Sequence, residues 1–414
     1  MKAVAEFTKR NSDKISYLLL NYLAYLMNFA SGLILARSLG PEKRGVVAFL
    51  SNLFLITLLI APLNAKNASS IAEAGLKSEE KCESREFSTY RVASISAVIT
   101  LVTSITYYYA LAGRLSNSLI MLFCIANLFN SIAVVIQIRE GILRTQNRLD
   151  QLAIIRFLGY ATPSFFVFIL FFFKKIEIEY VIFGQVVAML SNLLFLVIRR
   201  FPAPDYSTKD FSDKAFKTFG TYFLEYICNF IPLLLVMLSE QYAYIGLFAI
   251  AYGFSLISDT YFNIVESKVY SQLANIERNL PKSAVKTLSS GAKSLCVAQL
   301  FFVPLALLIP ILYGNLYSGS VQIAIFLIFS KLLYSILKIE CIYINLVLKR
   351  YRVPVLLNLL YAFSAYSIFL ISEPLAGVTH PWIVSVLIPS LFLPILGAFY
   401  IRINSLDTPN QRKP

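Results

Sequence analysis

Histidine is almost absent from this 414-residue chain, and cysteine and tryptophan are scarce. The single histidine, His380, has no second histidine with which to bind a metal and no nucleophile motif near it, so we assign it no role. None of the five cysteines is at metal-ligand spacing, and we interpret them as buried apolar side chains. Because a nucleotide-binding glycine loop is also missing, the sequence predicts neither a metal site nor a cofactor.

Charged residues are few, at 14% of the chain, whereas hydrophobic residues make up 57% and the mean hydropathy is +0.68. A soluble domain has about 25% charged residues. Backbone polar groups in lipid must be bonded internally, so membrane-spanning segments are helices or strands of a closed barrel. The apolar runs are about twice as long as barrel strands, which favours helices. The composition therefore predicts an all-α, polytopic membrane protein.

The apolar runs predict about twelve membrane-spanning helices. Several of them contain proline, which membrane helices tolerate because neighbouring groups bond the freed carbonyls. The first run is longer than the apolar region of a signal peptide and is expected to remain as a span. The twelve predicted spans are 15–36, 46–62, 91–112, 117–138, 151–173, 180–198, 218–238, 242–265, 292–313, 320–346, 355–373 and 381–401.

The basic residues, which give a net charge of +14, lie in short runs between the apolar segments. This placement fits contact with lipid headgroups and does not indicate nucleic-acid binding. Of the 37 Lys and Arg, 28 lie on the side of the N-terminus, 6 lie on the other side and 3 lie within spans. Because cytoplasmic loops carry an excess of Lys and Arg, both termini are predicted to be cytoplasmic.

The two halves of the chain carry matching features about 200 residues apart. Gly113 and Gly314, which follow the third and ninth spans, are 201 positions apart. Glu140 and Glu340, which lie at the inner ends of the fourth and tenth spans, are 200 positions apart. An offset of six spans gives two halves of the same orientation. Such a parallel repeat is typical of transporters whose site lies between the halves near the membrane midplane.

The boundary between these halves is expected in the basic loop 199–217, where Pro202 and Pro204 break the helices. The sequence therefore predicts two parallel, pseudo-symmetric six-helix bundles. The first is expected over residues 1–205 and the second over residues 206–414.

Two lysines lie within the tenth predicted span. Lys331 and Lys338 are two helical turns apart, so they lie on one helix face, with Tyr334 between them. Charge in the bilayer centre costs about 2.5–3.5 kcal/mol on insertion scales, so such residues usually face a protein interior or a cavity. Two cations on one face suit a phosphate or a pyrophosphate in a cavity. The alternative is an ion pair with an acid on a neighbouring helix, such as Glu225 or Asp259.

Other spans carry polar residues whose role the sequence leaves open. Arg156 in the fifth span either extends to the inner interface or lines the cavity. Asn28 and Asn229 belong to polar stripes on the first and seventh spans, which either bond neighbouring helices or line the cavity. Glu225 and Asp259 in the seventh and eighth spans are candidates for proton or cation coupling.

Residues 33–50 predict a hairpin, because a short polar turn from Arg37 to Arg44 separates two apolar runs. The distribution of Lys and Arg places this turn on the outer face. Arg37 is interpreted as an interfacial anchor rather than a ligand contact. With Gly40, Pro41 and Gly45 it forms a predicted outer-gate turn.

Four stretches of the chain resemble motifs of the O-antigen flippases, the Wzx type, of the multidrug, oligosaccharidyl-lipid and polysaccharide exporter superfamily. The turn ARSLGPEKRG is similar to the family's A-R-x-L-G-P-E-x-x-G, although Lys43 and Arg44 stand where an aromatic residue often precedes the glycine. LYGNLY is similar to its L-[FY]-G-x-x-[FY]. The other two stretches are residues 140–148 and 245–252.

The resemblance implies a twelve-helix transporter with two bundles and a basic central cavity. Such proteins move an undecaprenyl-pyrophosphate-linked oligosaccharide from the cytoplasmic to the periplasmic leaflet of the bacterial inner membrane by alternating access. The implied partners are this lipid-linked glycan and the bilayer, with a polysaccharide polymerase and a chain-length regulator as further candidates. Lys331, Lys338 and Arg156 would supply the cavity cations.

Two other functions remain open from the sequence. One is a cation-coupled drug exporter of the same superfamily. The other is a polysaccharide polymerase or ligase, but such enzymes resemble polytopic chains with a large periplasmic loop, whereas every predicted outer loop here is short. We therefore expect a transporter and not an enzyme.

Overall fold

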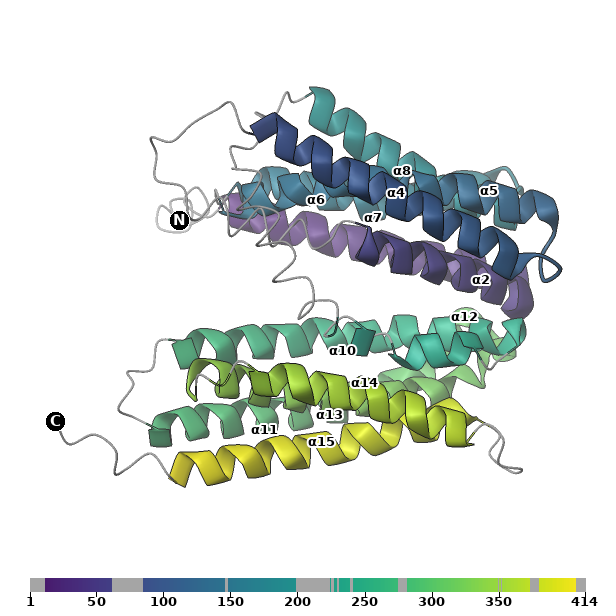
Figure 1. The fold of residues 1–414 in the computed structure, drawn as a ribbon. Helices are drawn as coiled ribbons and strands as arrows, with labels where there is room; N and C mark the ends of the chain where they lie inside the picture. Colours follow the sequence, from purple (N-terminus) through teal and green to yellow (C-terminus); the bar gives the residue numbers. More distant parts are fainter. Residues whose placement is uncertain are drawn as a thin grey trace, which may run out of the picture. The chain divides into compact units, whose positions relative to one another are not determined.

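The computed structural model describes residues 12–61, 85–145, 148–198, 224, 227–228, 231–238, 241–274, 281–348, 350, 352–372 and 380–406. The described residues are almost entirely helical and contain no strand beyond an isolated bridge between Ala112 and Leu115. The chain divides into two compact units, Met1–Phe223 and Leu224–Pro414, each of which is a helical bundle (Figure 1).

The described residues of the first unit form six helices. Within it α2 packs against α7, α7 packs against α8, and α4 packs against α5 and α6. The helices are α2 (Ser12–Ile60), α4 (Arg85–Leu111), α5 (Asn117–Leu128), α6 (Asn130–Thr145), α7 (Leu149–Phe172) and α8 (Ile178–Ile198).

The second unit is also helical throughout its described residues. Helix α13 lies at its centre and packs against α10, α11, α14 and α15. Residues 231–238 are helical too, while most of the predicted seventh span lies outside the described residues. The helices are α10 (Tyr242–Ala274), α11 (Pro281–Leu305), α12 (Ile309–Tyr313), α13 (Ser320–Leu346), α14 (Arg352–Ser372) and α15 (Pro381–Leu406).

Nine helical segments among the described residues are long and apolar enough to cross a membrane. Helices α5 and α6 form one such segment, Asn117–Leu143, and α11 to α12 form another, Val285–Tyr313. Helix α10 contributes a shorter apolar stretch, Tyr242–Ser258. A 24-residue helix such as α7 is about 36 Å long, enough for a hydrocarbon core of about 30 Å. The prediction of an all-α, multi-pass membrane protein is confirmed.

Polar and apolar side chains are distributed as a bilayer requires. Large apolar side chains are exposed on the helices, among them Phe172, Phe301 and Phe363. Small polar side chains such as Ser258 and Thr100 are buried between helices. In lipid the apolar side chains need no burial, whereas polar side chains need partners inside the protein.

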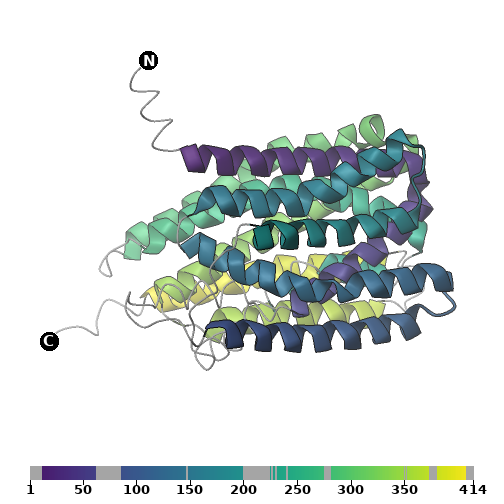
Figure 2. The same ribbon diagram turned by 90° about the horizontal axis from the view of Figure 1, so that it is seen from above.

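Helix α2 contains 49 residues, which would be about 74 Å long if it were straight. It is interrupted at Gly40, whose φ of 72° and ψ of 173° are accessible essentially only to glycine. Pro41 follows directly and is the first residue of the second arm. Leu35 and Val47, on either side of the interruption, pack into one cluster with Val167 of α7. The chain therefore reverses at Gly40, as the purple segment shows at one end of the first unit (Figure 2).

A buried polar network joins three helical segments of the first unit. At the break between α5 and α6, the Asn130 side-chain amide donates to the Phe54 backbone carbonyl of α2 at 3.1 Å and to the side-chain Oδ1 of Asn127 at 3.0 Å. The Asn127 amide in turn donates to the Ser104 hydroxyl of α4 at 3.0 Å. Both asparagines are fully buried, so these hydrogen bonds satisfy polar groups that could not bond to water within a bilayer.

The second unit has an aromatic core around Trp382 at the start of α15, the only tryptophan of the chain. Phe248 of α10 and Phe326 of α13 meet its ring edge-on, with centroid distances of 5.3 and 5.4 Å. Such edge-to-face pairs contribute about 0.5–1.5 kcal/mol beyond the area they bury. They fix the mutual positions of α10, α13 and α15, which carry the polar residues described next.

Because only glycine adopts the Gly40 conformation without strain, Gly40→Ala is expected to destabilise the first unit by about 1–3 kcal/mol. The measurement is the thermal unfolding midpoint of the purified full-length protein in detergent. Gly32→Ala is the matched control, because it lies in the same helix, has no positive φ, and leaves its new Cβ with no atom within 4 Å. Equal midpoints for the two variants would contradict the prediction.

Candidate functional site

Helix α13 places Lys331 and Lys338 in the interior of the second unit. Seven residues separate them, which is about 10 Å along the helix axis. Both side chains are partly buried, while Tyr334 between them is buried. The side chains of Ser330 and Ser335 are buried on the same helix. The helix therefore holds two partly buried ammonium groups within an apolar segment that is long enough to cross a membrane.

Lys331 lies against an aromatic ring of α10. Its Nζ is 4.3 Å from the centroid of the Tyr252 ring. A lysine over a tyrosine face is stabilised by about 0.5–2 kcal/mol, more where the pair is desolvated. The contact stabilises the ammonium through the face of the ring and does not itself neutralise the charge.

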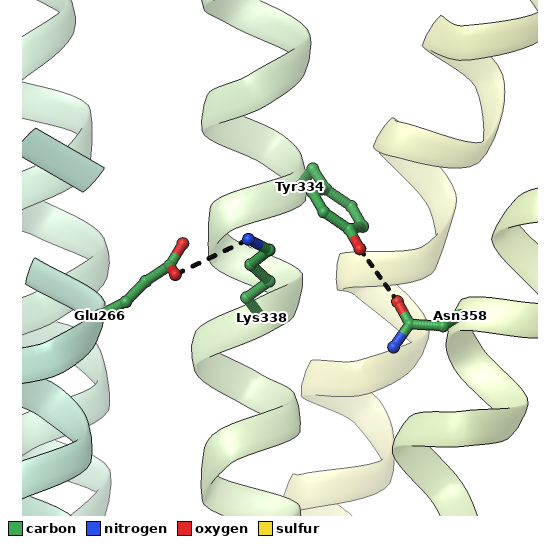
Figure 3. A network of polar contacts seen from close by, with 4 residues as sticks. All are labelled: Glu266, Tyr334, Lys338 and Asn358. Atoms are coloured by element: carbon green, nitrogen blue, oxygen red, sulfur yellow. Dashed lines mark hydrogen bonds and ion pairs between the residues drawn. The ribbon is translucent and has the colours of Figure 1, made fainter. Parts of the chain in front are cut away.

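Lys338 forms an ion pair with α10. Its Nζ lies 3.8 Å from Oε2 of Glu266 and 5.4 Å from the centroid of the Tyr334 ring (Figure 3). The two charged side chains are only 18% and 14% exposed. An ion pair with an acid on a neighbouring helix was the alternative to cavity lining that the sequence left open. The acid found is Glu266, two turns beyond Asp259 on the same helix.

Tyr334 is fixed by contacts with α14 and α15. Its hydroxyl donates to the Asn358 side-chain oxygen at 3.2 Å, and its ring lies 5.1 Å from that of Tyr361 (Figure 3). The Tyr361 and Ser390 hydroxyls share a hydrogen bond of 3.1 Å. These contacts connect α13, α14 and α15, and they hold the Tyr334 ring in place beside Lys338.

Arg156, the candidate cavity residue of the first unit, also forms an ion pair. Arg156 Nε on α7 lies 4.0 Å from Oε2 of Glu140 on α6, and the two side chains are 25% and 15% exposed. The pair joins the end of one span to the start of the next. Arg156 thus has an acidic partner, a role that the sequence did not suggest for it.

Glu340 is a polar residue of the second unit that the sequence reasoning noted only as a repeat match. It is 5% exposed, and its Oε2 has no hydrogen-bond partner among the residues that the structure describes. The carboxylate lies against Gly397 of α15, where an added Cβ would occupy the same space. The sequence does show that Glu340 is an acid at the inner end of an apolar span. It does not show whether the side chain is buried.

The other candidate residues are placed as follows. Asn28 and Arg37 are exposed on α2, and Gly45 is buried on its second arm. Asp259 belongs to α10, but its side chain is outside what the structure describes. Glu225 and Asn229 lie outside the described residues. In the described part of the chain, no three His, Cys, Asp or Glu side chains are grouped so that they could hold a metal ion.

No protein-family model and no curated protein sequence matches this chain. Solved structures of membrane transporters do match over nearly its full length. The lipid II flippase MurJ, in an inward closed conformation, has a TM-score of 0.71 and 19% identity over 95% of this chain and 91% of that one.

Two further structures belong to transporters of the MOP superfamily. A multidrug resistance MATE family transporter in an inward-facing conformation has a TM-score of 0.68 and 14% identity, covering 95% of this chain and 98% of that one. A MOP superfamily transporter from Pyrococcus furiosus has a TM-score of 0.55 and 15% identity, covering 95% and 94%. At these identities the likeness concerns the fold alone. This chain has the fold of MOP superfamily transporters, among which both flippases and drug exporters occur.

Gly397→Ala is expected to lower the thermal unfolding midpoint, because the new methyl group would occupy the space of the Glu340 carboxylate. Overpacking of this kind costs about 1–3 kcal/mol. Glu340→Asp, which shortens the side chain by one methylene, should recover part of the loss in the double variant. Gly253→Ala on α10 is the control, since no atom lies within 4 Å of its added Cβ. Additive effects in the double variant would show that the two residues do not compete for space.

Proposed function

We propose that this protein is a flippase for a lipid-linked oligosaccharide. Its substrate would be an undecaprenyl-pyrophosphate-linked repeat unit of O-antigen or a related surface polysaccharide. It would move this lipid from the cytoplasmic to the periplasmic leaflet of the bacterial inner membrane by alternating access. Both termini would be cytoplasmic, as the excess of Lys and Arg in the loops on that side indicates.

The observation that carries this proposal is the pair of partly buried lysines on α13. A pyrophosphate is a compact polyanion, and two flexible ammonium groups two turns apart suit its two phosphates. The resemblance of ARSLGPEKRG and LYGNLY to the flippase motifs supports the same substrate class. The similar fold of the lipid II flippase MurJ is consistent with it.

A drug exporter is the alternative, because the chain is also similar in fold to a multidrug resistance transporter. The lysines count against a cationic drug, since like charges repel in a medium of low dielectric constant.

The remaining polar candidates extend the proposal. Arg156 and Asn28 would contribute to the cavity of the first unit, and Asn229 to that of the second. Glu225 and Asp259 are proposed for ion coupling.

Deletion of the gene should deplete surface polysaccharide while lipid-linked repeat units accumulate on the cytoplasmic side. The plasmid-borne wild-type gene should restore export. The Lys331→Ala/Lys338→Ala double variant should restore less than about a tenth of it at equal protein level, since each contact to a charged group contributes about 1.5–3 kcal/mol. The measurements are surface polysaccharide by gel and lipid-linked intermediates by mass spectrometry.

The matched control is Lys286→Ala/Lys293→Ala, which removes two exposed lysines of α11 and should restore export fully. Normal surface polysaccharide in the deletion strain would refute the flippase proposal. Full export by the Lys331→Ala/Lys338→Ala variant would show that these lysines do not bind the substrate. Loss of drug resistance in the deletion strain, with normal polysaccharide, would support the drug exporter instead.

A further inference from the structure

Glu340 on α13 is a buried acid that the lysine site does not use. Its side chain is 5% exposed, and its Oε2 is buried without a hydrogen-bond partner among the described residues. By contrast, Glu266 and Glu140 lie 3.8 and 4.0 Å from the cationic groups of Lys338 and Arg156. The Glu340 carboxyl group must therefore be stabilised in a way other than an ion pair of this kind.

The carboxyl group of Glu340 lies on a tightly packed, apolar face of α13. Gly397 of α15 lies directly against it, and the Cβ of any other residue there would overlap the carboxyl group. Leu337 and Ile344, each about one turn away on α13, are 1% and 0% exposed. Tyr343, also one turn away, is 0% exposed, and its hydroxyl too lacks a hydrogen-bond partner in the described part of the chain. The inner end of α13 thus holds two buried polar groups that no described side chain satisfies.

The lysines of α13 do not share this face. At about 100° per residue, Lys338 lies about 160° and Lys331 about 180° around the helix from Glu340. Both lysines instead contact α10, at Glu266 and at Tyr252 respectively. The cations of α13 itself are therefore on the side of the helix opposite to Glu340.

The helices packed against α13 form no ion pair with Glu340 through their described side chains. Tyr361 of α14 shares its hydrogen bond with Ser390, and the half-buried Tyr400 lies about one turn beyond Gly397 on α15. The side chains of Asp259 and Lys268 on α10 lie outside the described residues. The described charged side chains of α10, α11, α14 and α15 are Glu266, which pairs with Lys338, and the exposed Lys286, Lys293, Arg352 and Arg402.

These surroundings limit which ligand the carboxyl group can bind. A metal ion requires several oxygen ligands, and no three His, Cys, Asp or Glu side chains are grouped to hold one in the part of the chain that the structure describes. The contact with Gly397 leaves no room for even one added carbon atom on that side. A proton requires neither further ligands nor space, and its binding is how a buried carboxyl group without a partner becomes neutral.

We propose that Glu340 is a proton-binding site that couples protonation to the packing of α13 against α15. The carboxyl group holds a proton while the two helices are packed as in this structure. When they separate and water reaches the side chain, the proton passes to a water molecule and a solvated carboxylate remains. When the helices pack again, the carboxylate takes a proton back from water. This inference goes beyond the proposed function, since it concerns a proton and holds for either cargo.

The proposal gives the coupling a direction and a side. The packed arrangement binds one proton more than the separated one, so acidic conditions favour packing and alkaline conditions favour separation. Glu340 lies at the inner end of its span, and the predicted topology places the proton exchange on the cytoplasmic side. Glu340→Gln has nearly the shape of the protonated acid and cannot ionise, so its helices should stay packed at every pH.

The first test is infrared difference spectroscopy of the purified full-length protein in lipid membranes, between acidic and alkaline pH. A protonated carboxyl group has a C=O stretching band that a carboxylate lacks. We expect a band of a buried carboxylic acid that decreases on alkalinisation in the wild type and is lost in Glu340→Gln. Glu177→Gln, the same change at an exposed position, is the matched control and should keep the band. The same band in folded Glu340→Gln would overturn the proton site.

The second test is hydrogen–deuterium exchange of the backbone amides of Pro381–Leu406, the residues of α15. Wild type and Glu340→Gln are compared at the same pH, so that the pH dependence of exchange itself cancels. We expect equal exchange in acid. At alkaline pH the wild type should exchange faster, by up to about tenfold for each unit of pH, the limit for one released proton. Equal exchange of the two proteins at every pH would overturn the coupling to α15.

A second variant covers a failure of Glu340→Gln to fold. Glu340→Leu also fills the space without a titratable group, so it should lose the same infrared band and the same dependence on pH. Neither measurement uses a transported substrate. Their failure would remove the proton site and leave the flippase proposal to the export assay, whereas normal surface polysaccharide in the deletion strain would refute the flippase and leave the Glu340 result intact.

Discussion

The absence of water from the hydrocarbon core is the constraint on which this structure depends. Each backbone and side-chain polar group within a span must find its partner inside the protein. The backbone meets this requirement through helices. Side chains meet it through contacts between helices, as in the bond from Asn130 to the Phe54 carbonyl and the pair of Lys338 and Glu266. The partner of a charged side chain within a span is therefore the first evidence for the role of that side chain.

The two units use their charges differently although their sequences match at an offset of about 200. Gly113 and Gly314 both have positive φ, at 81° and 99°, so the turn after the third span recurs after the ninth. Glu140 is paired with Arg156, whereas Glu340 lies against Gly397 with one oxygen lacking a hydrogen-bond partner. The two glycines thus share a backbone conformation, whereas the two acids have different surroundings. A transporter with two similar units can in this way concentrate ligand contacts in one of them.

The sequence predicted the helices and the face of α13 but not the partners of its lysines. Helical periodicity shows that Lys331 and Lys338 share a face. It does not show which level of a neighbouring helix meets them, and the acid that pairs with Lys338 is Glu266, which the sequence had not named. The burial of Glu340 was missed for the same reason, because burial depends on the residue opposite, here Gly397. By contrast, the reversal near Gly40 followed from local chemistry, since a glycine and a proline between apolar runs favour a turn.

The fold by itself does not separate a flippase from a drug exporter, because structures of both have folds similar to this chain. The proposal of a flippase therefore rests on the charges of the helix faces. A site for cationic drugs requires acids that are available to the ligand, whereas the acid described at this site is already engaged with Lys338. The proposal of an anionic substrate therefore rests on the two lysines that α13 carries two helical turns apart.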